Sequence, residues 1–453
     1  MKKRMLCLIL LLAQMLSSLA FAEGDPIRIA VIDSGISPYA VSPSSLEEGR
    51  NYIFPEESTM DKIGHGTGVA SIIVGSEPAG ITGLCPEAVL VPLVVLSTGE
   101  YGYKTAVDLD ELAAIIRDAI DVYHCDIINI SITSRETTDA LAEAVAYAEE
   151  QGVLIVSSSG NNSSRLVYYP SGYDSVLCVG SLDETGTNCT KFTNRHMFLD
   201  ILAPGVDLPM AGIHGEATTN TGTSFSSAYV TGVAAKLMTE YPHLTPSQVR
   251  RILCASATDL REPGFDKRTG WGALDTENAF AYAAVGRQYR DIPADLWFFP
   301  GVSYVSHLGL MESGDAVHFM PGTPMTRAAL WVVLHAMEGG TASPEAETWY
   351  EDARKWAIEN GIADGWDPER NLRREEAAAI LYSYAQYKGY DVSTNFDLSV
   401  FPDVGTVSED SAEALRWACG AGLMNGMDGL LAPRERATRA QIATMLMRLA
   451  QLK

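Results

Sequence analysis

Three polar residues of this 453-residue chain have the types and the order that nucleophilic catalysis requires. Asp33 ends an apolar run, His65 lies in the glycine-rich segment 64–68, and Ser224 lies in the segment 221–226. A serine hydroxyl is a weak nucleophile at neutral pH until an imidazole accepts its proton. The imidazole in turn needs a carboxylate that fixes its tautomer and stabilises its charged form. We therefore expect Asp33, His65 and Ser224 to act together as a catalytic triad.

The sequence around each triad member predicts the element that positions it. Residues 27–32 form an apolar, β-branched run that is typical of a strand buried on both faces, and Asp33 stands at its carboxyl end. In open α/β sheets, functional sites are built at that edge. His65 and Ser224 each precede a helical stretch, and the N-terminus of a helix favours nearby negative charge. The three side chains are thus expected at one edge of a sheet.

A further buried-strand pattern, residues 153–157, leads into a polar turn that contains Asn161. A side-chain amide at such a strand end can donate a hydrogen bond to the oxyanion of a tetrahedral intermediate. The loss of one donor of this kind costs roughly 3–4 kcal/mol of transition-state stabilisation.

The chain order Asp, His, Ser is that of the subtilisins. The resemblance to the subtilisin family covers residues 25 to about 285 and includes the segments 126–131 and 270–275. It implies a serine endopeptidase that hydrolyses peptide or protein substrates through an acyl-enzyme on Ser224 and needs no cofactor. It also implies that Asn161 and the backbone N–H of Ser224 form the oxyanion hole, because Ser-Gly-Asn is similar to the subtilisin oxyanion turn.

The same resemblance identifies the residues that bind substrate, which are Ser131, Thr133, Ser159, Gly160 and Tyr168. Two of these positions depart from the family. A Leu-Gly-Gly segment usually follows Ser131, but this chain has Ile-Thr-Ser, and a small residue usually stands where Tyr168 is found. The bulkier residues after Ser131 and at Tyr168 would form the wall and the floor of the primary pocket, which holds the substrate residue before the scissile bond. They predict that this pocket is narrow. These departures also leave an alternative open, namely a catalytically weak or silent surface protein whose main role is wall binding.

Apolar runs and helical stretches alternate along the first part of the chain. Strands are predicted at 27–32, 89–96, 126–131, 153–157 and 176–181, and helices at 65–74, 107–123, 138–150 and 225–241. This alternation predicts an α/β fold, with a subtilisin-like parallel sheet covered by helices on both faces. Thr245 and Pro246 mark the start of a last helix. We expect this peptidase domain to span residues 23–286.

Composition and the N-terminal segment indicate which partners and which location the protein can have. The net charge is −24, from 33 Lys and Arg against 57 Asp and Glu, which excludes nucleic acid as a natural partner. Residues 1–22 have the basic end, apolar centre and small-residue end of a secretory signal peptide. No later run approaches 18 continuous apolar residues, so we expect a secreted protein that does not span a membrane.

Six of the seven cysteines lie beyond the signal segment, and none has the close spacing of a metal site. Scattered cysteines with apolar neighbours are more often buried thiols than a disulfide framework. We predict buried thiols and no metal site, and a pairing of Cys178 with Cys189 remains open.

From residue 291 onward, a helix–loop–helix pattern occurs three times, at 291–340, 343–392 and 399–453. Units of this kind must stack on one another, because one unit alone cannot bury its apolar face. The pattern resembles three S-layer homology repeats. It implies an all-α module that binds anionic secondary cell-wall polysaccharide and attaches the protein non-covalently to the cell wall or S-layer.

By residue match, Arg327, Arg374 and Arg439 are the candidate ligands of this polysaccharide. The planar guanidinium group suits a carboxylate on the polymer, and each arginine stands at a predicted helix start. The alternative is that these arginines pack against neighbouring repeats.

Overall fold

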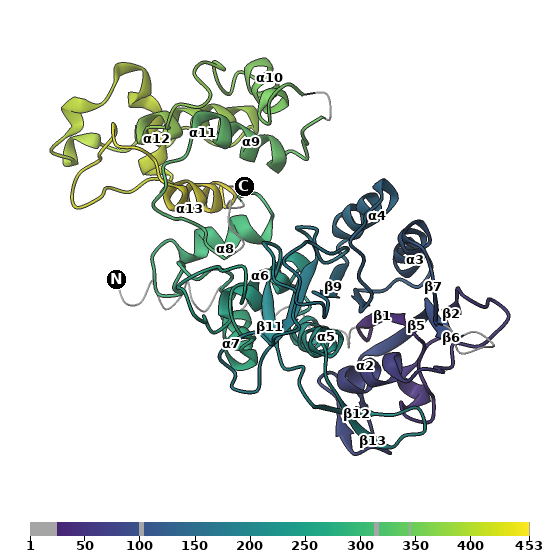
Figure 1. Ribbon diagram of the computed structural model, residues 1–453. Coiled ribbons are helices and arrows are strands. Elements are labelled where there is room, and N and C mark those ends of the chain that lie inside the picture. Colours follow the sequence, from purple (N-terminus) through teal and green to yellow (C-terminus); the bar gives the residue numbers. More distant parts are fainter. Residues whose placement is uncertain (1–24, 99–103, 312–316, 344–345, 453) are drawn as a thin grey trace. The chain divides into compact units, whose positions relative to one another are not determined.

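The computed structural model describes residues 25–98, 104–311, 317–343 and 346–452 (Figure 1). These residues divide into two compact units. The first contains the chain up to Leu253 together with residues 257–276, and the second contains residues 254–256 and the chain from Glu277 onward. The predicted signal segment, residues 1–22, lies outside the described residues.

The first unit is built on a seven-stranded sheet in which every neighbouring pair of strands is parallel. The strand order is β11-β10-β9-β8-β1-β5-β2. The strands are β1 (Arg28–Asp33), β2 (Arg50–Asn51), β5 (Val89–Val94), β8 (Ile127–Ile130), β9 (Leu154–Ser158), β10 (Leu177–Ser181) and β11 (Ile201–Ala203). All five predicted strands are present, and the parallel sheet is confirmed.

Helices cover both faces of this sheet, as predicted (Figure 1). Helices α2 (His65–Val74) and α5 (Thr223–Glu240) pack on each other and on the sheet, and α3 (Leu109–Asp121) packs on α4 (Asp139–Glu150) at the other face. The side of β1 that carries Ala30 and Ile32 shares one apolar core with α3 and α4. A strand buried on both faces needs a continuous apolar run, and β1 has one.

Three short antiparallel hairpins lie outside the main sheet, and the sequence pattern predicted none of them. They are β3 (Gly75–Ser76) with β4 (Ile81–Thr82), β6 (Leu96–Thr98) with β7 (Lys104–Ala106), and β12 (Leu208–Ala211) with β13 (Ala217–Asn220). The predicted helix after Thr245 is α6 (Pro246–Ser256), which begins with a capping box, and α7 (Thr276–Ala284) follows. Short 3-10 turns occur at Pro43–Ser45, Leu398–Val400, Val404–Thr406 and Glu409–Ser411.

The second unit is helical and has its own apolar core, which contains the buried rings of Trp331, Tyr384 and Trp417. Besides most of α7, its helices are α8 (Phe299–His307), α9 (Arg327–Met337), α10 (Glu351–Glu359), α11 (Arg374–Tyr387), α12 (Ala412–Gly420) and α13 (Arg439–Leu449). Helix α9 packs on α10, α11 on α12, and α13 on α8. The second helix of each predicted copy therefore packs on the first helix of another copy.

A ring of backbone hydrogen bonds joins the segments that precede α9, α11 and α13. The N–H of Met325 donates to the carbonyl of Ala437 (2.9 Å), that of Ala437 to Leu372 (2.8 Å), and that of Leu372 to Met325 (2.8 Å). Each of these residues stands two positions before the arginine that begins its helix. The three helix starts thus share one pattern of backbone hydrogen bonds.

All six cysteines of the described residues are buried thiols, as predicted, and Cys178 and Cys189 do not form a disulfide with each other. Within the described part of the chain, no helix has the length and apolar character that a membrane span requires.

Candidate active site

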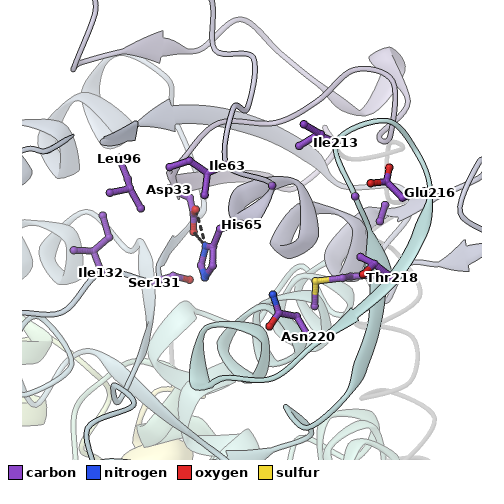
Figure 2. Close-up of a pocket in the computed structure, with 14 residues that line it drawn as sticks. Asp33, Ile63, His65, Leu96, Ser131, Ile132, Ile213, Glu216, Thr218 and Asn220 are labelled. Atoms are coloured by element: carbon purple, nitrogen blue, oxygen red, sulfur yellow. Dashed lines mark hydrogen bonds and ion pairs between the residues drawn. The ribbon is translucent and has the colours of Figure 1, made fainter. Parts of the chain in front are cut away.

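Asp33 and His65 are in direct contact at the carboxyl edge of the sheet (Figure 2). The imidazole Nδ1 lies 2.8 Å from Oδ1 and 2.9 Å from Oδ2 of the carboxylate. Asp33 is only 1% exposed, and the N–H of Ser34 donates to its Oδ1 at 2.7 Å. Because a carboxylate only accepts, the proton of the neutral imidazole is held on Nδ1, and Nε2 is left as the basic nitrogen.

The buried carboxylate of Asp61 fixes the backbone that carries His65. Its Oδ1 accepts hydrogen bonds from the N–H groups of the two residues before His65, at 2.8 and 2.9 Å. Its Oδ2 accepts from the N–H of Thr67 at 2.9 Å, and the hydroxyl of Ser34 donates to its Oδ1 at 2.9 Å. These bonds connect the end of β1 to the first turn of α2. Asp61 was not among the predicted site residues, because it stands three residues before the N-cap Gly64 and so gives no N-cap signal.

Ser224 is the second residue of α5 and is 6% exposed. At this position its backbone N–H has no partner within the helix, because the first four N–H groups of a helix lack one. The adjacent Phe225 packs on the imidazole of His65, with 5.2 Å between the two ring centroids. The structure therefore brings the first turn of α5 to His65.

Asn161 contacts the same helix start. Its Oδ1 accepts from both the N–H and the hydroxyl of Thr223, each at 3.0 Å, and the N–H of Gly160 donates to the Thr223 hydroxyl at 3.2 Å. With the amide oxygen held in this way, the Nδ2 hydrogens are the part of the exposed Asn161 side chain that remains for a ligand.

A cavity of about 530 Å³ opens beside His65 (Figure 2). The predicted residues Asp33, His65 and Ser131 line it, and the rest of its lining was not among the predicted site residues: Ile63, Gly64, Leu96, Ile132, Met210, Ala211, Gly212, Ile213, Glu216, Thr218 and Asn220. Most of these residues belong to the β12–β13 hairpin and its turn. They carry no motif, so no short signal would have found them.

Other predicted substrate-binding residues also come together. Ser134 and Tyr169 form two backbone hydrogen bonds, of 2.9 and 2.7 Å, which bring the chain after Thr133 beside the segment of the half-buried Tyr168. A Cβ added at Gly160 would lie 3.3 Å from the Thr133 hydroxyl. Gly160 also has a φ of +94°, a conformation that favours glycine. Ser159, next to it, is fully buried.

In the helical unit, Arg327, Arg374 and Arg439 each reach from one predicted copy to another. The guanidinium of Arg327 pairs with Asp364, and that of Arg374 donates to the carbonyls of Asn425 (2.9 Å) and Leu431 (3.2 Å). Arg439 donates from Nε to the carbonyl of Phe319 (2.9 Å). Arg327 and Arg374 are 8% and 4% exposed. Burial lowers the pKa of Arg374 and Arg439, and both remain charged at neutral pH.

Comparison with known proteins matches both parts of the chain to families. Residues 24–272 match the model of the subtilase family, and residues 400–443 match that of the S-layer homology domain. Subtilisin DY of Bacillus licheniformis is 32% identical over 265 residues, which cover 57% of this chain and 92% of that protein. Subtilisin Savinase of Lederbergia lenta is 30% identical over 257 residues, which cover 56% and 91%.

Solved structures give the same result. Fervidolysin from Fervidobacterium pennivorans, a keratinolytic enzyme related to subtilisin, matches with a TM-score of 0.52 and 30% identity, over 57% of this chain and 43% of that one. The prenylagaramide maturation protease PagA matches with a TM-score of 0.50 and 27% identity, over 58% and 95%. The chain belongs to the subtilase family of serine endopeptidases and carries an S-layer homology domain in its C-terminal part.

Proposed function

We propose that this protein hydrolyses peptide bonds through an acyl-enzyme on Ser224. The observation that carries the proposal is the contact between the buried Asp33 carboxylate and Nδ1 of His65 at 2.8 Å. This contact leaves Nε2 of His65 basic, and Nε2 would take the proton of the Ser224 hydroxyl as the hydroxyl attacks the substrate carbonyl. The imidazolium that forms is stabilised by the same carboxylate. It then gives the proton to the leaving amine.

The tetrahedral oxyanion would be bound by two donors, Nδ2 of Asn161 and the backbone N–H of Ser224. Support comes from the fixed orientation of the Asn161 amide, whose oxygen is held by Thr223. Hydrogen-bond donors that are already oriented give the most stabilisation to charge that develops only in the transition state. Water then attacks the acyl-enzyme with His65 again as the base.

The primary pocket is proposed to be narrow, with Ser131, Thr133, Ser159, Gly160 and Tyr168 as the residues that contact substrate. The proximity of Thr133 to Gly160 supports this, because the threonine side chain takes space that a glycine would leave open. The phenol ring of Tyr168 is a further bulky group in the same region. We therefore expect a preference for small residues before the scissile bond.

Labelling by a fluorophosphonate tests the proposed chemistry, since this reagent needs an activated serine. The wild type should react at one site, and Ser224→Ala should not react. Ser226→Ala is the matched control, because it removes a hydroxyl two residues away in the same helix and should leave labelling intact. A wild-type protein that does not label would support the alternative of a silent protease-fold surface protein.

We further propose that the C-terminal unit attaches the secreted protein to an anionic cell-wall polysaccharide. The match to the S-layer homology family at residues 400–443 supports this for one copy, and the hydrogen-bond ring through Met325, Leu372 and Ala437 supports three equivalent copies. Arg327, Arg374 and Arg439 are the proposed ligands. Their contacts between copies also support a packing role, so a test must separate binding from stability.

A further inference from the structure

A second cavity of the first unit has a strongly cationic lining. Its volume is about 590 Å³, similar to that of the cavity beside His65. Five positive side chains line it, together with the two carboxylates of Glu262 and Asp266, and the five are Arg165, Arg195, Arg261, Lys267 and Arg268. The local net charge is therefore positive in a chain whose net charge is −24. Such a concentration of cations is an electrostatic site for anions.

The cations come from three separate segments that surround the cavity, residues 165–167, 195–197 and 261–268. Backbone hydrogen bonds hold two of these segments together, since the N–H of Arg195 donates to the carbonyl of Ser164 at 2.8 Å. The third segment is fixed by Asp266, whose Oδ1 accepts from the N–H groups of Arg268 (2.7 Å) and Thr269 (3.0 Å). The walls are therefore built by the fold and do not depend on a ligand.

The two carboxylates of the lining offset only part of this positive charge. Among the residues that the structure describes, none of the five forms an ion pair with a carboxylate. Asp266 already accepts from the backbone of its own loop. In addition, Nε of Arg195 is buried and has no hydrogen-bond partner. An incompletely paired guanidinium gains free energy when an anion binds close to it.

His196 supplies a second and independent indication of a ligand. It lines the cavity, is only 3% exposed, and its Nδ1 accepts from the N–H of Phe198 at 3.2 Å. The proton of the neutral ring is therefore on Nε2, which is buried and has no partner. Burial lowers the pKa of His196 to about 4, so the ring stays neutral at physiological pH and Nε2 remains a hydrogen-bond donor.

We propose that this cavity binds a compact polyvalent oxyanion that carries phosphate or carboxylate groups. Guanidinium groups bind such groups with paired, charge-assisted hydrogen bonds, and four of the five cations are arginines. Two residues of the lining, Arg195 and His196, also hold buried nitrogen donors that have no acceptor in the protein, so this wall offers donors and not acceptors to a ligand. The anion is either a free small molecule or the phosphate groups of a polymer, which have the same chemistry.

Calorimetric titration of the full chain tests this site, with Ser224→Ala as the background to prevent self-digestion. The probes are sodium tripolyphosphate and a soluble glycerol-phosphate polymer, each at constant ionic strength. We expect saturable binding of tripolyphosphate that is tighter than that of inorganic phosphate, because more oxygens meet the five cations. Tighter binding of the polymer per site would assign the site to a polymer, and tighter binding of tripolyphosphate would assign it to a free anion.

The double variant R261A/K267A should weaken tripolyphosphate binding about tenfold or more, since it removes two charge-assisted contacts. The matched control is R117A/K236A, which removes the same charge from α3 and α5. There Arg117 lies over the Tyr147 ring and Lys236 pairs with Glu240. This control should change the affinity less than about twofold, because surface charges at a distance are screened by salt.

The absence of saturable binding to the folded parent, or an equal loss in both double variants, would overturn the proposal. Circular dichroism and thermal unfolding must show that the variants are folded. If R261A/K267A fails to fold, R165E gives the same comparison, because Arg165 is exposed and lies on a different wall of the cavity.

Discussion

Asn161 is bound to Thr223 by two hydrogen bonds, from the backbone N–H and from the hydroxyl, that both end on its amide oxygen. The strand end after β9 is thereby tied to the residue immediately before Ser224. This contact sets the direction of the Asn161 amide, so that its donor end is the part left for a ligand.

If Asn161 contributes to an oxyanion hole, its loss should act on the chemical step. Asn161→Ala should lower kcat by about 10²–10³-fold with little change in KM, because the missing donor acts on charge that develops in the transition state. Steady-state kinetics on a peptide amide substrate measures both constants.

Thr223→Val is the matched control for this prediction. It removes one of the two bonds to the Asn161 oxygen and keeps the backbone N–H bond, so kcat should fall much less than in Asn161→Ala. An Asn161→Ala protein with the kcat of the wild type would contradict the assignment.

The sequence predicted most of the elements that position Asp33, His65 and Ser224, because these elements carry their own local signals. The β-branched run of β1 spans six consecutive residues, and Thr245 and Pro246, which mark the start of α6, are adjacent. The parallel sheet then follows from their alternation. Local pattern and fold agree in this part of the chain.

The β12–β13 hairpin and Asp61 show what the sequence did not predict. The four residues of β13 are all exposed and three of them are polar, so they lack the alternation that marks a half-buried strand. The hairpin nevertheless contributes Thr218 and Asn220 to the cavity beside His65. Asp61 accepts hydrogen bonds from backbone N–H groups, which every residue except proline carries. Its partners therefore cannot be recognised from their residue types. Sites that depend on tertiary proximity or on backbone donors leave little trace in a single sequence.

The proposed narrow pocket predicts a change of specificity when Tyr168 is replaced by a smaller residue. Tyr168→Gly should raise kcat/KM for peptides with Phe or Leu before the scissile bond by one or two orders of magnitude, because the added pocket volume lets a larger side chain be buried. A series of peptides that differ only at this position provides the measurement. The wild type should favour Ala, Gly or Ser. A wild type that cleaves best after large aromatic residues would refute the argument.

The buried thiols predict a loss of stability at alkaline pH. Burial raises the pKa of Cys125 to about 12, whereas in the unfolded chain it is about 8.5. The neutral thiol is favoured in the folded state, so this stability is fully present below about pH 8.5 and is lost as the pH rises toward 12. The loss for this one thiol should reach about 2 kcal/mol at pH 10, at 1.36 kcal/mol for each pH unit.

Urea unfolding at pH 7 and pH 10 measures this effect, and Cys125→Ala separates it from other titrations. The variant should lose less of its free energy of unfolding between the two pH values than the wild type does. Equal losses in the two proteins would show that the thiol ionises as easily in the folded state as in the unfolded one. Thiol reagents at pH 8 should also leave all six buried cysteines of the folded protein unmodified.

Arg327, Arg374 and Arg439 predict a loss of wall binding when they are replaced together. In the Ser224→Ala chain, their triple replacement by Ala should weaken co-sedimentation with cell-wall sacculi by several kcal/mol, if each forms a hydrogen bond to a charged group worth about 1.5–3 kcal/mol. Sacculi stripped of their anionic polysaccharide should not bind either protein. The matched control replaces Arg373, Arg434 and Arg436, which are exposed, lie a few residues before the start of α11 or α13 and carry the same charge.

The contacts of the three arginines between copies make the folded state of the triple variant part of this test. Removal of a buried guanidinium leaves carbonyls such as that of Leu431 without a donor, so the midpoint of thermal unfolding should also fall. Circular dichroism at the binding temperature must show intact helices before the binding result counts. A folded triple variant that sediments as well as the parent would mean that the arginines only hold the copies together, and that the polysaccharide binds elsewhere on the unit.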